Sequence, residues 1–352
     1  MHGVDNGVVS LQDELTGQTL AVKPKVVVNA AGPWIDFAND RFAEKTRFIG
    51  GTKGSHLVID NPALHAATQG HELFFENTDG RICLFFPLQD KVLVGTTDIP
   101  IEDPDDAICT DDEITYMLEM IRIVFPSIPV ERSQIVFTFS GVRPLPATDA
   151  ANPGQISRDH KIEVTQPGNG ANFPVYSLIG GKWTTFRAFG EQVADKILRH
   201  LGQSREVDTH DMAIGGGRQY PQTGPDQMIW VKKLHAATGL PEERLRILFD
   251  RYGTYAEDVA AFLAAGEDSP LAAMPDYSRR EIEFLATYEH IAHLDDLLLR
   301  RSLLAMLGYA SHELIEEIAP IVGQVLDWSA EEMPVEIERT VQLLRSRHRI
   351  AE

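Results

Sequence analysis

The sequence is poor in cysteine and in basic residues. Of its 352 residues, two are cysteines, 32 are Lys or Arg and 52 are Asp or Glu, which gives a net charge of −20. Cys83 and Cys109 lie far apart and form no CxxC or Cys/His pattern. We therefore expect structural thiols in a reducing compartment rather than a disulfide scaffold or a metal site. The acidic balance argues against nucleic-acid binding, because a phosphate backbone would be repelled.

Long apolar stretches are absent too. No run of about 18 or more apolar residues occurs, so we expect no membrane-spanning helix. The N-terminal stretch MHGVDNGVVS lacks the basic and apolar regions of a signal peptide. These absences favour a cytoplasmic protein. Peripheral association with the inner face of the cell membrane stays open, although the sequence offers no polybasic patch for anionic lipid.

Several motifs that would identify an enzyme class are also missing. GxGxxG, the P-loop pattern GxxxxGK[ST], HExxH and GxSxG do not occur. The chain therefore carries no dinucleotide fingerprint of its own, and we predict neither a nucleotide P-loop, a metal site nor a serine hydrolase. The glycine triplet Gly215–Gly217 lies in a linker without a preceding apolar strand.

The first 205 residues contain a series of short strand signals. Alternating patterns, β-branched runs and turn residues predict strands, and the stretch TDDE at 110–113 is typical of a helix capping box. The expected elements are a hairpin over 7–22 with its turn at Gly17, a short apolar strand over 26–28, antiparallel strands over 56–100 with turns at 61–62 and 78–81, a helix from 110 to 125, strands over 134–140, 161–165 and 175–179, and a helix from about 184 to 201. The apolar stripes of the two helices would be Ile114, Met117, Leu118, Ile121 and Val124, and Phe186, Phe189, Val193, Ile197 and Leu201.

The composition changes at residues 205–225, where glycine and proline punctuate a linker. Nearly everything after it shows three-to-four apolar periodicity, which predicts a separate helical domain over 210–352. The expected helices are 226–238, 242–252, 254–265, 279–290, 293–306, 311–326 and 330–347. The charges at 295–296 and 300–301 are interpreted as solvated or inter-helix pairs.

The strongest local signal is the stretch IGGKWT at 179–184, a strand followed by a diglycine turn and a helix start. Unpaired N–H groups and the positive end of the helix dipole make such a start an anion site. Glycine lets a planar ligand or a phosphate approach the backbone, and Lys182 adds a positive charge. An ordinary tight turn with Thr184 as the N-cap explains the same residues equally well when they are taken alone.

Two further candidates stand at strand ends. Pro144 restricts Arg143 to extended geometry, which would present its guanidinium rigidly to a phosphate or a carboxylate. His56, in the stretch KGSH, is able to accept a proton near neutral pH. A surface arginine and a structural histidine are the competing interpretations. The stretch Arg158-Asp159-His160 is interpreted as a local ion pair first and as a ligand contact second.

Together these motifs resemble a known family. VVVNAAGPW, KGSH, VLVGTTD, FSGVRPL, ISRD and LIGGKWTTFR occur in the order seen in FAD-dependent glycerol-3-phosphate dehydrogenases, members of the D-amino-acid-oxidase-like flavoprotein superfamily. The resemblance covers residues 7 to about 200, and the stretches YGTYAEDV and HLDDLLLRRSLLA resemble the cap domain of the same family. It implies a mixed α/β and α+β fold. The expected parts are an incomplete FAD-binding domain over 1–45 and 140–205, an antiparallel substrate-binding sheet over 46–139 and an all-helical C-terminal domain over 210–352.

The resemblance also implies roles for single residues. It places the FAD cofactor beside Asn29, Ala31, Gly32, Trp34, Gly180, Gly181, Lys182 and Thr184. It makes His56 and Arg143 catalytic residues over the flavin, and one of them assists proton removal while hydride passes to flavin N5. Which of the two takes the proton stays open. Recognition of the substrate and its phosphate would be shared by Arg143, Arg158 and Lys182.

We consider three functions, two from the resemblance and a third from the missing glycine-rich motif. The first is oxidation of sn-glycerol 3-phosphate to dihydroxyacetone phosphate with electrons passed to a quinone. The second is an oxidase that reduces oxygen, and the third is a non-catalytic module whose helical part makes oligomer or membrane-surface contacts. Members of the family begin with a βαβ unit carrying a glycine-rich motif, and this sequence has none. We therefore expect an N-terminally truncated chain of weak or absent activity, with a strand at 26–28 that lacks neighbours and exposes an apolar edge.

Overall fold

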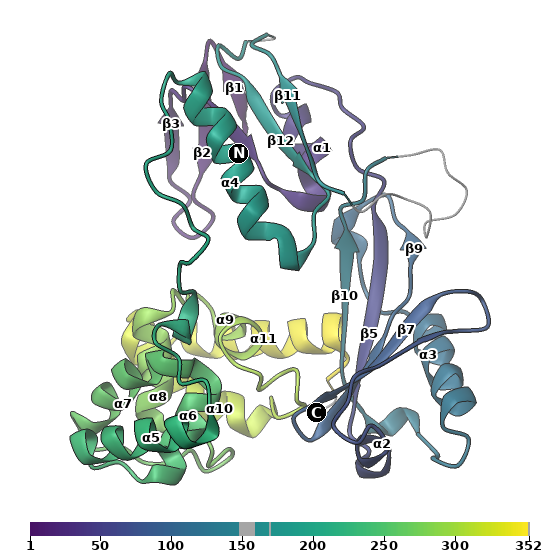
Figure 1. Cartoon of the computed structure of the whole chain (residues 1–352). Helices are drawn as coiled ribbons and strands as arrows, with labels where there is room; N and C mark the ends of the chain where they lie inside the picture. Colours follow the sequence, from purple (N-terminus) through teal and green to yellow (C-terminus); the bar gives the residue numbers. More distant parts are fainter. Residues whose placement is uncertain (148–158, 169, 351–352) are drawn as a thin grey trace. The chain divides into compact units, whose positions relative to one another are not determined.

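A computed structural model describes residues 1–147, 159–168 and 170–350. The chain divides into two compact units, residues 1–211 and 212–352. β-sheets make up most of the first unit, and helices make up the second (Figure 1). The subdivision of the first unit into a cofactor part and a substrate part stays a prediction.

The first unit begins with a small antiparallel sheet. β2 (Val8–Gln12) and β3 (Thr19–Val22) form the hairpin predicted over 7–22, and Gly17 in its turn has a φ of 69°. β1 (Gly3–Asp5) pairs with β2 as a third strand that the sequence did not predict. A small core of buried side chains lies beneath, formed by Val9, Phe42, Ala171, Phe173 and Val175.

A second sheet carries the short apolar strand. β4 (Val27–Asn29) runs parallel to β12 (Val175–Ile179), which pairs antiparallel with β11 (Lys161–Thr165). The expectation that this strand lacks neighbours is therefore wrong, because β12 pairs with one of its edges. Its other edge ends the order β11-β12-β4 within the described residues, and Val28 there is exposed. A 3₁₀ turn, η1 (Gly32–Trp34), and α1 (Ile35–Asp40) follow β4.

The largest sheet is six-stranded and antiparallel, with the order β10-β5-β8-β7-β6 and β9 beside β5. Its strands are β5 (Thr52–Ile59), β6 (Leu73–Glu76), β7 (Ile82–Leu88), β8 (Lys91–Gly95), β9 (Ile99–Pro100) and β10 (Ile135–Arg143). α3 (Asp111–Val124) packs on one face (Figure 1), and Thr110 and Glu113 form its predicted capping box. Burial of apolar side chains between helix and sheet holds the two together. Both cysteines are buried and unbridged.

Several local expectations in this unit are wrong. Asn61-Pro62 does not make a simple turn: Asn61 caps α2 (Pro62–Ala67) by accepting a hydrogen bond from the Leu64 N–H at 2.9 Å. Val124, placed on the apolar stripe of α3, is exposed because it lies at the helix end. Phe186 and Leu201, placed on the apolar stripe of α4 (Phe186–His200), are exposed as well, because they lie at its two ends. Phe189 and Val193 form its buried face.

The second unit is helical, as predicted. Its helices are α5 (Gly224–Thr238), α6 (Glu242–Tyr252), α7 (Ala256–Ala264), α8 (Arg279–Tyr288), α9 (Leu294–Arg300), α10 (His312–Leu326) and α11 (Glu332–His348). Asp295 is buried in α9 and pairs with Arg300 at 2.8 Å and with Arg339 of α11. The charges at 295–301 thus include an inter-helix pair, which is one of the two interpretations given above.

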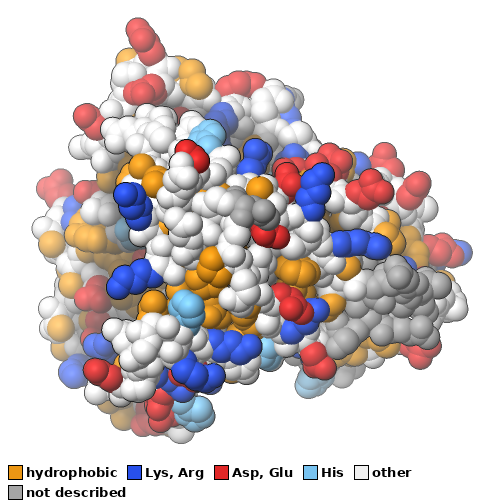
Figure 2. Space-filling view, turned by 90° about the horizontal axis from the view of Figure 1, so that it is seen from above, with side chains coloured by type: hydrophobic (Ala, Val, Ile, Leu, Met, Phe, Trp, Pro, Cys, Tyr) orange, Lys and Arg blue, Asp and Glu red, His pale blue; other side chains and the backbone are white. Residues whose placement is uncertain are grey.

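Surface properties agree with the composition. Acidic and basic side chains are intermixed over the face seen in Figure 2. None of the helices in the described ranges combines the length and the apolar character that a membrane crossing requires.

Candidate functional site

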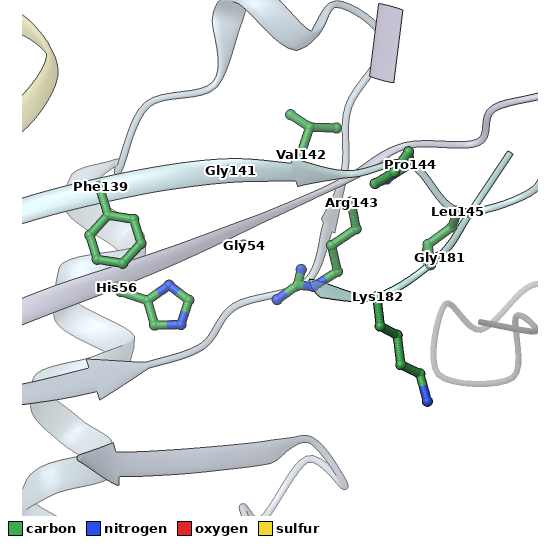
Figure 3. Close-up of a pocket in the computed structure, with 11 residues that line it drawn as sticks. Gly54, His56, Phe139, Gly141, Val142, Arg143, Pro144, Leu145, Gly181 and Lys182 are labelled. Atoms are coloured by element: carbon green, nitrogen blue, oxygen red, sulfur yellow. The ribbon is translucent and has the colours of Figure 1, made fainter. Parts of the chain in front are cut away.

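The antiparallel pair β5–β10 brings two predicted site residues to one face of the sheet. In its register His56 stands opposite Phe139, Gly54 opposite Gly141, and Thr52 opposite Arg143. Because side chains alternate along a strand, the side chain of His56 and the side-chain position of Gly54 lie on the same face of the sheet. The Arg143 side chain runs back over Gly54 toward His56 (Figure 3).

Two glycines make room for these side chains. A methyl group on Gly54 would overlap the guanidinium of Arg143, and one on Gly95 would overlap the imidazole of His56. β8 pairs with the edge of β5 that β10 leaves open, and Gly95 of β8 stands directly opposite His56 there. The sequence stretches KGSH and VLVGTTD therefore meet at this point, and each supplies a residue whose missing side chain shapes the site.

His56 is held as a neutral imidazole. Its ring stacks on Phe139 with 4.8 Å between ring centroids and an interplanar angle of 7°. Burial, followed by the positive charge of Arg143, lowers the pKa of His56 to about 4. Nδ1 is buried and has no hydrogen-bond partner among the described residues. The ring is therefore uncharged at neutral pH and keeps a lone pair that a ligand hydroxyl can approach.

The Arg143 guanidinium is clamped by the segment that follows β8. Nη1 pairs with a carboxylate oxygen of Asp98 at 3.1 Å. Nη2 donates to the Thr96 hydroxyl at 3.0 Å and to the Thr97 carbonyl at 3.2 Å. The sequence analysis attributes this rigidity to Pro144 and does not identify Thr96, Thr97 or Asp98 as partners. The signal was present in VLVGTTD, where two hydroxyls and a carboxylate follow a strand directly.

The diglycine turn approaches the same face from β12. Gly180 and Gly181 have φ angles of 73° and 97°, which other residues rarely adopt. The Lys182 N–H donates to the Thr185 hydroxyl at 3.0 Å, so Thr185, and not Thr184, closes this turn. α4 begins only at Phe186, after the 3₁₀ turn η5 (Trp183–Thr185). The predicted helix start near Thr184 is thus two residues too early.

These elements enclose one pocket of about 350 Å³ in the first unit. His56, Arg143, Lys182 and both glycines of the 180–181 turn line it, together with Gly54, Phe139, Gly141, Val142, Pro144 and Leu145. Figure 3 shows His56 and Phe139 at one end and Lys182 at the other, with Arg143 between them. The structure therefore brings together the histidine, arginine and lysine that the sequence selected from three distant motifs.

The remaining predicted residues lie elsewhere. Asn29, Ala31, Gly32, Trp34 and Thr184 do not line this pocket. Asn29 is buried and donates to the Ile35 carbonyl at 2.9 Å, so its side chain shapes the turn that follows β4. Trp34 donates to Asp105 at 3.1 Å. Arg158 lies outside the described residues. In the described ranges, no group of three or more His, Cys, Asp or Glu side chains is arranged to hold a metal ion.

Comparison with known families agrees with this architecture. The family model of FAD dependent oxidoreductases matches residues 2–194. The model of the C-terminal domain of alpha-glycerophosphate oxidase matches residues 207–333. The first match covers more than half of the chain, and the chain therefore belongs to the FAD dependent oxidoreductase family.

Individual relatives carry related names. A glycerol-3-phosphate dehydrogenase of Synechocystis is 32% identical over 317 residues, which are 85% of this chain and 55% of that protein. The mitochondrial glycerol-3-phosphate dehydrogenase of Rattus norvegicus is 28% identical and is matched over 95% of this chain and 45% of its own length. The chain thus spans about half the length of these curated relatives.

A solved structure shares the fold. The glycerol-3-phosphate dehydrogenase from Bacillus halodurans, determined in complex with FAD, superposes with a TM-score of 0.79 at 22% identity, covering 96% of this chain and 65% of that chain. The mixed α/β region with its antiparallel sheet and the helical C-terminal unit are therefore an arrangement found in a known enzyme, as predicted.

Proposed function

We propose that this chain forms the substrate side of an FAD-dependent enzyme that oxidises sn-glycerol 3-phosphate to dihydroxyacetone phosphate and passes the electrons to a quinone. The observation that carries the proposal is the pocket in which His56, Arg143 and Lys182 meet. A neutral base beside the Arg143 guanidinium, with Lys182 at the other end of the same pocket, suits a substrate that bears both an alcohol and a phosphate. The family match and the names of the relatives support the choice of cofactor and substrate.

The residues of the pocket fit a flavin ring. Gly180 and Gly181 turn the backbone between β12 and α4 with positive φ angles and line the pocket, so the wall there is backbone that a flat ring can approach. Lys182 adds a positive charge at this edge, which suits the negative charge of a reduced ring. FAD, when bound, supplies the acceptor for the hydride that leaves C2 of the substrate.

His56 is the proton acceptor in this proposal. The Arg143 guanidinium stays protonated and is already paired with Asp98, so it binds charge and does not take up a proton. The imidazole of His56 is neutral above about pH 4. A bound phosphate dianion would raise the pKa of His56, because an opposite charge favours the protonated ring. Substrate binding would thus make the base stronger when the C2 hydroxyl has to lose its proton.

The test is a dye-reduction assay with sn-glycerol 3-phosphate, run on this chain and on the longest reading frame that contains it. His56→Asn should lower kcat about 100-fold or more with little change in KM, because it removes the base and keeps a polar group. Arg143→Met should act mainly by raising KM. An exposed histidine of the same unit, in the variant His71→Asn, is the matched control.

Two outcomes would reject the proposal. The first is the absence of flavin absorbance and of turnover in the longer form. The second is equal activity of the His56→Asn variant and the parent. The electron acceptor is decided in the same assay: reduction of a ubiquinone analogue without peroxide supports the dehydrogenase, whereas peroxide formation in air supports the oxidase.

A further inference from the structure

A buried ion pair lies on the reverse face of the strand that carries His56. Lys53 and Ser55 alternate with Gly54 and His56 along β5, so their side chains point to the face that α3 covers. Glu113, in the first turn of α3, meets them there with its carboxylate 2.7 Å from the Lys53 ammonium. Glu113 is 2% exposed and Lys53 is 7% exposed. A charged pair is therefore buried directly behind the pocket.

The Glu113 carboxylate is fully hydrogen-bonded. One oxygen accepts from the Ser55 hydroxyl at 2.7 Å and from the Thr97 hydroxyl at 2.6 Å. The other accepts from Lys53 at 2.7 Å and from the Thr110 N–H at 2.9 Å. Burial by itself would raise the pKa of Glu113, but these donors, Lys53 first, outweigh it and bring the pKa to about 2. The carboxylate is thus an anion at neutral pH.

Thr97 links this anion to the pocket. Its hydroxyl donates to Glu113 and accepts from the Ser55 N–H at 2.9 Å, so the residue is fixed from two sides. Its carbonyl accepts from Arg143 at 3.2 Å. Its chain neighbours Thr96 and Asp98 supply the other two acceptors described above. These three partners of the Arg143 guanidinium therefore belong to one segment of three residues, whose middle residue is anchored to Glu113.

We propose that Glu113 and Thr97 are positioning residues for Arg143, so that the buried carboxylate sets the location of the guanidinium in the pocket through the segment 96–98. Replacement of a buried ion pair by apolar groups is often neutral or stabilising, so stability alone does not account for its presence here. A fixed polar network instead defines one arrangement of the groups around it. The consequence for catalysis rests on the proposed function, whereas the coupling between Thr97 and Arg143 does not.

The coupling can be measured without cofactor or substrate. The positive charge of Arg143 contributes to the low pKa of His56, so displacement of Arg143 should raise that pKa. NMR titration of ring-labelled histidines, with the His56 signal assigned from the His56→Gln variant, reports it directly. In Thr97→Val, which keeps the shape and loses the hydroxyl, the His56 midpoint should rise by at least about half a pH unit. Thr97→Ser keeps the hydroxyl and should restore the parental midpoint.

A destabilised helix is the alternative explanation, and the chain offers a matched control. Met117 lies one turn after Glu113 in α3 and is fully buried against the sheet. Met117→Ala should lower the melting temperature at least as much as Thr97→Val but leave the His56 titration unchanged. Glu113→Gln is the second test variant, and it should move the midpoint in the same direction as Thr97→Val.

Kinetics test the role in catalysis. In the flavin-loaded protein, Thr97→Val should lower kcat/KM for sn-glycerol 3-phosphate about tenfold, mainly through KM, and Thr97→Ser should recover most of it. An unchanged His56 midpoint in both Thr97→Val and Glu113→Gln would overturn the inference, as would the same shift in Met117→Ala. A shifted midpoint without turnover in any form would sustain the coupling and reject the proposed function instead.

Discussion

At the scale of single residues, the pocket depends on a histidine whose environment favours its uncharged form. His56 is stacked on Phe139 and lies beside the Arg143 guanidinium. A buried ring with a cation for a neighbour takes up a proton only well below neutral pH. The same shift affects folding, since an unfolded chain protonates this histidine near its ordinary pKa.

Acidification should therefore remove stability through His56. The pKa of His56 is about 4 in the folded chain, against 6.5 ordinarily. Between these pH values the unfolded state binds a proton that the folded state does not, so stability falls as the pH falls. The loss amounts to about 3 kcal/mol by pH 4. Urea unfolding at several pH values between 7.5 and 4.5, for the parent and His56→Gln, measures it. As the pH drops, the free energy of unfolding of the parent should fall relative to that of His56→Gln, which lacks the titrating ring. A difference between the two that stays constant with pH would contradict the assigned environment.

At the scale of elements, close packing of β5, β8 and β10 sets the geometry. Gly54→Ala would insert a methyl group where the Arg143 guanidinium lies. We expect a loss of about 1–3 kcal/mol, typical of overpacking. Gly141→Ala, on the paired strand, is the control for stability, because a methyl group there meets open space. Its free energy of unfolding should change by less than about 0.5 kcal/mol. Equal effects of the two substitutions in urea denaturation would show that Arg143 does not lie over Gly54.

The sequence predicted elements better than it predicted their ends. β11 and β12 have the predicted bounds, and the capping box of α3 is where the pattern placed it. The predicted start of α4 is too early because the 3₁₀ turn η5 precedes the helix. The sequence of such a turn is hard to distinguish from that of a helix N-terminus. β1, the additional strand of the small N-terminal sheet, has three residues, which are too few to show the alternation that predicts a strand.

The candidate site was predictable where its residues belong to local sequence motifs, and not where strand register places them. His56, Arg143 and Lys182 carry distinctive chemistry inside recognisable motifs, and the pocket contains all three. Asp98, Thr97 and Glu113 are ordinary residues whose importance arises from strand register and from the position of α3, neither of which a single sequence supplies. Local patterns thus identified three residues that line the pocket but not the groups that hold them.

At the scale of the whole molecule, two units with separate cores are joined by an exposed stretch. The residues from 201 to 226 are exposed, apart from positions 209, 216 and 221. Exposed backbone of this kind is a preferred site of proteolysis. Limited trypsin digestion should cut first within this stretch, at Arg205 or Arg218, and leave two fragments near the unit boundary at 211–212. Mass spectrometry identifies the cuts, and circular dichroism shows whether each purified fragment stays folded. Early cleavage inside α5–α11, with the linker intact, would contradict two independent cores.

The glycines at 54 and 95 also give a rule for reading other sequences. Because an alanine at either position would displace the guanidinium or the imidazole, a related chain with a larger residue there has to place these groups differently. The residues at these two positions therefore indicate, before any coordinates are determined, whether another protein can present the same arginine and histidine to a ligand.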